Sequence, residues 1–242
     1  MDLFARQWAT YRAVVHHDLM EHSGGTAATA AALAGWLAQR PADAAAPVMA
    51  DLGCGDLALL APLLQRLPLG SYTGLDLTAE VLPLAQAALG PVPYATCWQQ
   101  GDLLAWIQAD GPPIDLLHAA FALHHLSDAD KQAFLRAARR RIAAGGLLIW
   151  ADVFREPGES LTAYRQRYSA RIRRGWDGLS PTQQEQVIDH LSSFDLPAER
   201  GAIEAVAAAA GWQWRWAWQG RHRAEALALL TPNGTGSPQL QG

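Results

Sequence analysis

The segment APVMADLGCGDL, residues 46–57, decides how the rest of the sequence is interpreted. Its apolar run VMADL predicts a buried strand that ends at Asp51, and Gly53 and Gly55 follow at once. Glycine lets a backbone adopt torsions that other residues avoid, and it lets a ligand approach closely. A strand followed by such a loop predicts a ligand site at the start of an α/β domain.

Strands and helices alternate along the chain outward from this segment. Each strand is followed by a helical pattern, which predicts a Rossmann-like, doubly wound α/β fold with a mostly parallel, seven-stranded sheet. The last two strands form an antiparallel hairpin with a tight turn at Gln219-Gly220. Ser127 is predicted to cap the helix that follows the fourth strand. The parallel strands are expected at residues 48–52, 71–77, 92–100, 114–120 and 146–154.

The chain is expected to fall into five parts. Two helices, broken apart by the Ser-Gly-Gly at 23–25, form an N-terminal cap, and the sheet core follows it. A helical insertion then forms a lid, before a last helix and the hairpin complete the core. A disordered tail is expected at the end. The boundaries are 1–45, 46–154, 155–198, 199–231 and 232–242.

Composition and charge narrow the class of protein. The net charge of −4 predicts no general attraction to nucleic acid or to anionic membranes. The basic run at 165–174 is interpreted as a solvated helix face. No apolar run is long enough to span a bilayer, and the two cysteines, Cys54 and Cys97, have no metal-binding or disulfide spacing. We therefore expect a cytoplasmic enzyme.

Acidic residues follow three successive predicted strands. Asp51 and Asp56 flank the glycine loop, which suits a cationic ligand better than a pyrophosphate, and Ala58 replaces the third glycine of a dinucleotide fingerprint. Asp76, after the second strand, is placed to accept both ribose hydroxyls of a nucleoside. Asp102, after the third, is placed to accept from an adenine amino group. These features together suit S-adenosylmethionine.

The motifs in this order resemble those of the class I S-adenosylmethionine-dependent methyltransferases. The resemblance covers residues 45–152 by motif and the terminal hairpin by topology. The family's first motif often has a further glycine where this chain has Leu57. The matching motifs are DLGCGDL at 51–57, GLDLT at 74–78, GDLL at 101–104, DLLHAAFALHHLSD at 115–128 and AAGGLLIWAD at 143–152.

The resemblance implies a role for each matching residue. It implies that S-adenosylmethionine is the cofactor, S-adenosylhomocysteine the product, and a small molecule the methyl acceptor. Asp51, with Gly53, Cys54 and Gly55, would line the methionine moiety. The ribose and adenine would contact Asp76 and Leu77, and the adenine edge would contact Asp102 and Leu103. Ala119 and Phe121 would face the sulfonium.

Candidates for the acceptor side follow from residue type. His124 and His22 are candidate general bases, because imidazole titrates near neutral pH, whereas hydrogen bonding is the expected role of His125. The histidines of the first helix, His16, His17 and His22, lack a metal's ligand set, so no metal is expected. Candidate acceptor-binding residues, each with packing as the alternative, are Tyr11, His22, Tyr164, Tyr168, Arg171 and Trp176.

Two features leave alternatives open. Trp212, Trp214, Trp216 and Trp218 alternate with other residues, which predicts four indoles on one face of a strand, packed in the core.

The favoured function is methyl transfer to an oxygen or nitrogen of a small molecule, by a monomer or homodimer. The alternatives are a non-catalytic S-adenosylmethionine-binding subunit and a nicotinamide-dependent oxidoreductase.

Overall fold

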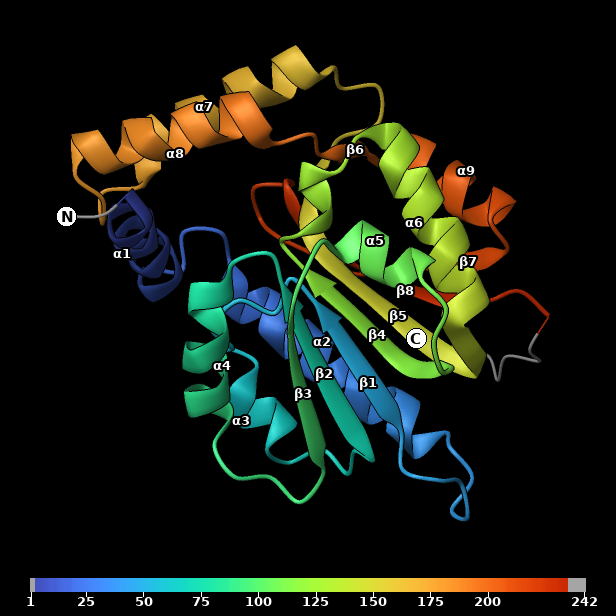
Figure 1. Ribbon diagram of the computed structural model, residues 1–242. Coiled ribbons are helices and arrows are strands. Elements are labelled where there is room, and N and C mark those ends of the chain that lie inside the picture. The colour runs from blue at the N-terminus through green and yellow to red at the C-terminus, as the bar shows by residue number, and fades with distance from the viewer. Residues whose placement is uncertain (1–2, 235–242) are drawn as a thin grey trace.

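The computed structural model describes residues 3–234, with side chains described from residue 8 onward. A single sheet runs through the centre in the order β3-β2-β1-β4-β5-β8-β7 (Figure 1). The strands β1 to β5 are parallel neighbours, and β8 and β7 are antiparallel. The predicted seven-stranded, doubly wound sheet with its terminal hairpin is therefore confirmed, while the division into five parts stays a prediction.

The parallel strands fall close to their expected positions. They comprise β1 (Val48–Leu52), β2 (Ser71–Asp76), β3 (Ala95–Gln100), β4 (Ile114–Ala120) and β5 (Ile142–Arg155). A short strand, β6 (Ala198–Glu199), pairs with the end of β5. The hairpin consists of β7 (Trp212–Gln219) and β8 (Glu225–Pro232). Pro232, which the sequence places in the tail, is the last residue of β8. Residues 235–242 lie outside the described part.

Helices cover both faces of the sheet (Figure 1). One apolar core lies under α5 (Leu103–Gln108), α6 (Asp128–Arg141) and α9 (Arg200–Ala209). The other lies under α2 (His22–Ala38), α3 (Ala61–Leu64) and α4 (Leu82–Leu89), and the 3-10 turn η1 (Ala79–Val81) precedes α4. At the N-terminus of α6 the Ser127 hydroxyl accepts the Asp130 N–H at 3.1 Å, so the predicted cap is confirmed.

The lid lies above the carboxyl ends of the parallel strands (Figure 1). It contains α7 (Leu161–Gly175) and α8 (Pro181–Phe194), beside the N-terminal helix α1 (Leu3–His16). These helices enclose an apolar cluster of their own, which includes Val14, Tyr168 and Leu191. No described helix combines the length and the apolarity that crossing a membrane requires.

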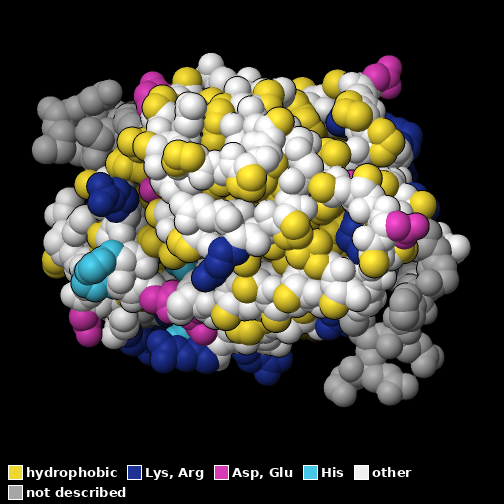
Figure 2. All heavy atoms as spheres, turned by 90° about the horizontal axis from the view of Figure 1, so that it is seen from below, with side chains coloured by type: hydrophobic (Ala, Val, Ile, Leu, Met, Phe, Trp, Pro, Cys, Tyr) yellow, Lys and Arg dark blue, Asp and Glu magenta, His cyan; other side chains and the backbone are white. Residues whose placement is uncertain are grey.

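The face opposite the lid carries apolar and uncharged side chains across its middle, with arginines mostly toward the margins (Figure 2). A continuous basic surface is the electrostatic signature of nucleic-acid binding. This face of the described chain does not present one.

The break between the first two helices is earlier than predicted. The chain turns at residues 17–21, where Asp18 and Glu21 have φ of 51° and 54°, and the Ser-Gly-Gly at 23–25 lies inside α2. The reason is a tertiary contact, because a Cβ on Gly24 would lie 2.7 Å from the Trp218 ring. Glycine is present here to admit the indole, and it does not end the helix.

The four alternating tryptophans of β7 do not all lie on the same face of the sheet. A register shift between Trp216 and Trp218 inserts one extra residue, and a bulge of this kind re-aims the side chains that follow it. Trp212, Trp214 and Trp216 pack in the core under α6 and α9, whereas Trp218 packs with α2 on the other face. Core packing is confirmed, and the single face for all four indoles is wrong.

The hairpin turn is longer than the tight turn predicted at Gln219-Gly220. Residues 220–224 separate the two strands. The Gly220 N–H donates to Glu225 O at 2.8 Å, and the Arg223 N–H donates to Gly220 O at 3.0 Å. The Glu21 carboxylate accepts the Arg221 N–H at 2.9 Å, so contact with the α1–α2 junction shapes this longer turn.

The glycines of α2 supply a test of this packing. We expect Gly24→Ala to lower the free energy of unfolding by about 1–3 kcal/mol, because the added methyl overpacks against Trp218. Gly35→Ala in the same helix is the control, since a Cβ there meets nothing within 4 Å, and the helix gains about 0.5–1 kcal/mol. Urea unfolding measures both, and equal stabilisation by the two changes would contradict the packing.

Candidate cofactor and acceptor site

The loop after β1 is tied to the end of β2 by backbone hydrogen bonds. The N–H groups of Gly53 and Cys54 both donate to Leu75 O, at 2.8 and 2.9 Å. The Gly55 N–H donates to Asp76 Oδ2 at 2.9 Å. Gly53 and Gly55 have φ of 78° and 54°, and a Cβ on Gly53 would lie 2.6 Å from that of Ala122. Glycine is therefore required at Gly53 both by conformation and by space.

Leu57 occupies the position where the family often has a further glycine. Its φ is 57°, in the left-handed region that glycine adopts freely, which costs a leucine about 1–2 kcal/mol. Its side chain is buried in the core under α2 and α3. Burial of a leucine contributes about 1.5–3 kcal/mol, so packing offsets the strained backbone, and the loop keeps the shape that glycine would give it.

Two of the predicted acids lie at the carboxyl edge of the sheet. Asp76 Oδ1 accepts the Thr78 N–H at 2.9 Å, and the next residue, Leu77, is 70% exposed. Asp102 is exposed and caps α5, accepting the Ala105 N–H at 2.7 Å, with Leu103 beside it. A carboxylate can accept the hydroxyl groups of a ribose, and an exposed apolar side chain beside it can pack against the flat base. The residues present therefore fit a nucleoside.

Asp51 is sealed inside the sheet instead of lining an open surface. It is 2% exposed, and both of its carboxylate oxygens are bonded. Tyr72 Oη donates to Oδ2 at 3.0 Å, and His118 Nδ1 lies 2.7 Å from Oδ1. Burial, then the charge of Asp51, raises the pKa of Tyr72, which stays a donor. A contact of Asp51 with a ligand's ammonium group therefore needs a bridging water.

Cys54 is a small buried side chain and not a nucleophile. Its exposed fraction is 8%. Burial, followed by the negative charges of Asp51 and Asp76, raises the pKa of its thiol. The thiolate is the reactive form of cysteine, so the role of Cys54 is to fill space beside Gly74.

Helix α1 brings Tyr11 to the glycine loop. Partial burial, followed by the negative charges of Asp56 and Asp76, raises the pKa of Tyr11, although 41% of the residue is exposed. The hydroxyl therefore stays protonated at neutral pH, beside the carboxylates that flank the loop. The contact of Tyr11 with an acceptor, expected from the sequence, stays a prediction.

Phe121 and His22 lie together just past the end of β4. Their rings are 4.9 Å apart, and Phe121 has a φ of 49°, held by its N–H donating to Ala151 O at 2.8 Å. Strained backbone of this kind concentrates at functional sites. His22 Nδ1 is buried without a hydrogen-bond partner among the described residues. Ala119 is fully buried in the core, so it does not face a ligand as predicted.

His124 does not open toward an acceptor. It is 7% exposed, and its Nδ1 lies 2.5 Å from Asp152 Oδ1. Burial lowers the pKa of His124, but the charge and hydrogen bond of Asp152 outweigh burial and raise it. Its Nε2 lies 3.6 Å from Asp195 Oδ1. Two carboxylates therefore enclose the ring. Asp152 and Asp195, like His118, were missed from the sequence, since no short spacing links them.

The aromatic residues predicted to bind the acceptor form the inside of the lid instead. Tyr164, Tyr168 and Trp176 are 0%, 3% and 2% exposed. Tyr168 Oη donates to Glu225 Oε1 at 2.6 Å, and Arg171 Nη1 donates to the same atom at 2.6 Å. The fully buried Glu225 of β8 therefore anchors α7 to the sheet. The three aromatic side chains do not line an open site in this conformation.

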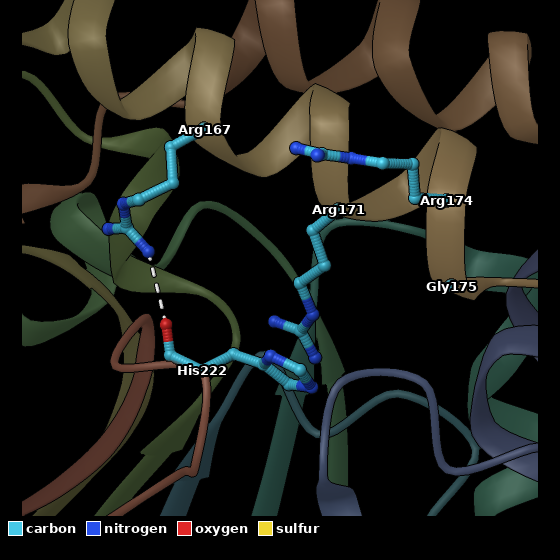
Figure 3. A pocket seen from close by; sticks show the side chains of 5 residues that line it. All are labelled: Arg167, Arg171, Arg174, Gly175 and His222. Atoms are coloured by element: carbon cyan, nitrogen blue, oxygen red, sulfur yellow. Dashed lines mark hydrogen bonds between the residues drawn. The ribbon is translucent and has the colours of Figure 1, made fainter.

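An open hollow of about 330 Å³ lies between α7 and the hairpin turn. Arg167 and Arg171 extend from α7 toward His222, while Arg174 lies along the helix (Figure 3). Glu159 neutralises Arg167, and Glu225 neutralises Arg171. In the described part of the chain no acidic side chain pairs with Arg174, so the hollow keeps a smaller positive charge than its three arginines suggest.

Sequence comparison matches residues 50–148 to the family described as a methyltransferase domain. The chain is 38% identical over 112 residues to trans-aconitate 2-methyltransferase of Azoarcus sp. (strain BH72), covering 46% of this chain and 41% of that protein. It is 29% identical over 140 residues to an uncharacterized methyltransferase of Geobacillus thermodenitrificans (strain NG80-2), covering 57% and 60%. The chain therefore spans about half the length of these relatives.

Solved structures of methyltransferases share the fold. Magnesium protoporphyrin IX methyltransferase from Synechocystis PCC 6803 with bound S-adenosylhomocysteine superposes with a TM-score of 0.57 at 15% identity, covering 87% of this chain and 84% of that one. Human N-acetylserotonin methyltransferase in complex with S-adenosylmethionine gives 0.51 at 18% identity, covering 78% and 48%. Residues 50–148 are a class I, S-adenosylmethionine-dependent methyltransferase domain.

This methyltransferase domain contains the residues that the sequence predicted on the cofactor side. The match begins in β1 and ends in β5, so it contains Gly53, Gly55, Asp76 and Asp102. The family, the fold and the cofactor class expected from the motifs are confirmed. The lid, α1 and the hairpin lie outside the matched range.

His22 gives the protein a predicted pH dependence of stability. Burial lowers its pKa from 6.5 to about 4, so protons favour the unfolded chain, and stability falls as the pH drops from about 6.5 toward 4. The loss is about 2 kcal/mol at pH 5. We expect His22→Gln to reduce the difference in unfolding free energy between pH 7 and pH 5 by about that amount. An unchanged difference would contradict the burial of a neutral His22.

Proposed function

We propose that this protein transfers the methyl group of S-adenosylmethionine to an oxygen or nitrogen atom of a small-molecule acceptor. The observation that carries the proposal is the edge of the sheet where the Gly53 N–H donates to Leu75 O and the Gly55 N–H to Asp76, with Asp102 after the next strand. When bound, S-adenosylmethionine supplies a methyl group carried by a sulfonium. After the methyl group is transferred, the sulfur is left as a neutral thioether, which is a good leaving group. The protein's task is then alignment and exclusion of water.

Each residue of this edge has a proposed part in binding. Backbone at Gly53 and Gly55 allows close approach of the methionine moiety, and Asp51 meets its ammonium through a water. Asp76 accepts the ribose hydroxyls, for which its carboxylate keeps lone pairs beyond the two that Gly55 and Thr78 use. Leu77 and Leu103 cover the adenine, and Asp102 accepts from its edge.

We place the acceptor next to Phe121 and His22, beneath α1 and the lid. His22 holds a buried Nδ1 without a partner among the described residues, and a polar group of an acceptor would satisfy it. Its pKa of about 4 makes it a weak base at neutral pH. Its proposed role is therefore to orient the acceptor by a hydrogen bond, and the base role predicted for His22 and His124 is not retained.

An organic-acid anion is the acceptor class that the comparison favours, because one relative is named for trans-aconitate. A carboxylate is already deprotonated at neutral pH, so its methylation needs no general base. As expected from the sequence, the proposed enzyme is a monomer or homodimer in the cytoplasm and has no nucleic-acid or membrane partner.

Asp76 tests the cofactor assignment. We expect Asp76→Ala to weaken binding of S-adenosylhomocysteine about 10- to 100-fold, the effect of losing hydrogen bonds to a charged acceptor of about 1.5–3 kcal/mol. Isothermal titration measures it, and circular dichroism checks that the variant folds. Asp110→Ala, at an exposed acid between α5 and β4, is the matched control and should bind like the unaltered protein. Equal affinities would show the ribose assignment to be wrong.

Turnover separates methyl transfer from its alternatives. We expect the protein to form S-adenosylhomocysteine from S-adenosylmethionine when a small carboxylic acid, phenol or amine of the right shape is present, measured by mass spectrometry over a panel of such compounds. A regulatory subunit would bind the cofactor without turnover on any of them. Binding of NAD⁺ in place of S-adenosylhomocysteine would favour the oxidoreductase.

A further inference from the structure

We propose that the turn after β4 and the end of α8 together bind a divalent transition-metal ion of the zinc type. The ligands are His124 and His125 of the 3-10 turn η2 (Leu123–His125) and Asp195, which follows α8. His190 lies beside this group, with its Nε2 3.5 Å from Asp195 Oδ1. This site is separate from the cofactor edge, and the inference does not depend on the proposed methyl transfer.

The distances from the imidazole nitrogens to Asp195 are close to those between ligand atoms in a zinc site. Three imidazole nitrogens surround one carboxylate oxygen, Asp195 Oδ1. His124 Nε2 lies 3.6 Å from it, His125 Nδ1 3.5 Å and His190 Nε2 3.5 Å. Zinc bonds of about 2.0–2.1 Å in tetrahedral geometry separate ligand atoms by about 3.4 Å. The ligand atoms of His124, His125 and Asp195 all lie within 4.8 Å of one another.

Asp195 gives a second, independent observation in favour of a cation site. The residue is 8% exposed, and its Oδ1 is buried without a hydrogen-bond partner among the described residues. A buried carboxylate oxygen with no partner is costly. Imidazole nitrogens at about 3.5 Å are too far for a good hydrogen bond. An ion at the centre of the cluster would bind this oxygen and the nitrogens together.

The surroundings of His124 are those of a metal-binding histidine. Its Nδ1 lies 2.5 Å from Asp152 Oδ1, an arrangement that turns the other ring nitrogen toward the metal in many zinc sites. Asp152 is itself fixed, since its Oδ2 accepts the Leu123 and His124 N–H groups at 3.1 and 3.0 Å and the Trp150 Nε1–H at 3.0 Å. Nε2 of His124 is therefore aimed at Asp195.

The backbone around the cluster is already in place. The Leu196 N–H donates to His124 O at 2.7 Å, and Lys131 Nζ donates to Leu196 O at 2.6 Å. Arg165 Nη2 donates to Asp195 O at 3.1 Å. An ion here would link α8 of the lid to the turn after β4. Nitrogen-rich donors with one carboxylate favour zinc over magnesium or calcium.

Zinc titration of the untagged protein, stripped with a chelator, tests the proposal. We expect one equivalent to bind with micromolar or tighter affinity by isothermal titration, and metal analysis of the dialysed protein should give the same stoichiometry. The double variant His125→Ala/His190→Ala should bind at least about 100-fold more weakly. Its side chains are 43% and 50% exposed, so the fold should tolerate their loss.

Two further measurements assign the site. The variant His16→Ala/His17→Ala, which removes the other pair of adjacent histidines, is the control and should bind zinc unchanged. Cobalt should give the visible spectrum of tetrahedral coordination in the control but not in His125→Ala/His190→Ala. Absence of stoichiometric zinc binding, or equal binding by the two double variants, would overturn the proposal. In that case a protonated Nε2 of His124 would face the Asp195 carboxylate in place of a metal ion.

Discussion

The hydrogen bonds that join the loop after β1 to the end of β2 set the positions of the predicted contacts with the methionine moiety and the ribose. Gly53 and Cys54 are fixed on Leu75 O, and Gly55 is fixed on the carboxylate of Asp76. The acid proposed for the ribose therefore also shapes the loop proposed for the methionine moiety. This loop needs left-handed torsions at three positions, one of which is a leucine whose burial offsets the strain.

The lid depends on a second constraint, a carboxylate with no exposure to solvent. Glu225 at the start of β8 receives hydrogen bonds from Tyr168 and Arg171 of α7, and Arg171 also donates to Leu19 O at 2.7 Å, which reaches the N-terminal region. Removing one partner of such a buried pair leaves an uncompensated charge, which is strongly destabilising. Sheet, lid and N-terminal cap are thereby linked around the site proposed for the acceptor.

Local signals in the sequence predicted the sheet and its cofactor edge. Residues 114–120 form β4 as predicted, and Ser127 caps α6, because alternating strands and helices and N-cap residues act over short distances. Contacts between distant segments could not be read in this way. Gly24 lies within a helix to admit Trp218, and an added residue in β7 turns Trp218 to the opposite face. The sequence around Gly24 and the sequence of β7, each taken alone, contain no pattern that predicts this contact or this added residue.

The acceptor side was predicted less well for a related reason. Tyr164, Tyr168 and Trp176 were assigned to the acceptor from their chemical type, but type does not say which way a helix turns its side chains, and these face inward. His124 was assigned as a base from its neighbours in sequence. Its actual partners, Asp152 and Asp195, are 28 and 71 positions further along the chain, and they enclose it.

A crystal structure of the complex with S-adenosylhomocysteine tests the central claim most directly. The account predicts the ribose hydroxyls on Asp76, the adenine against Leu77 and Leu103, and the amino-acid end over Gly53 and Gly55, with Tyr11 of α1 beside it. Density for the ligand elsewhere, for example in the arginine-lined hollow under α7, would contradict the assignment of the cofactor edge.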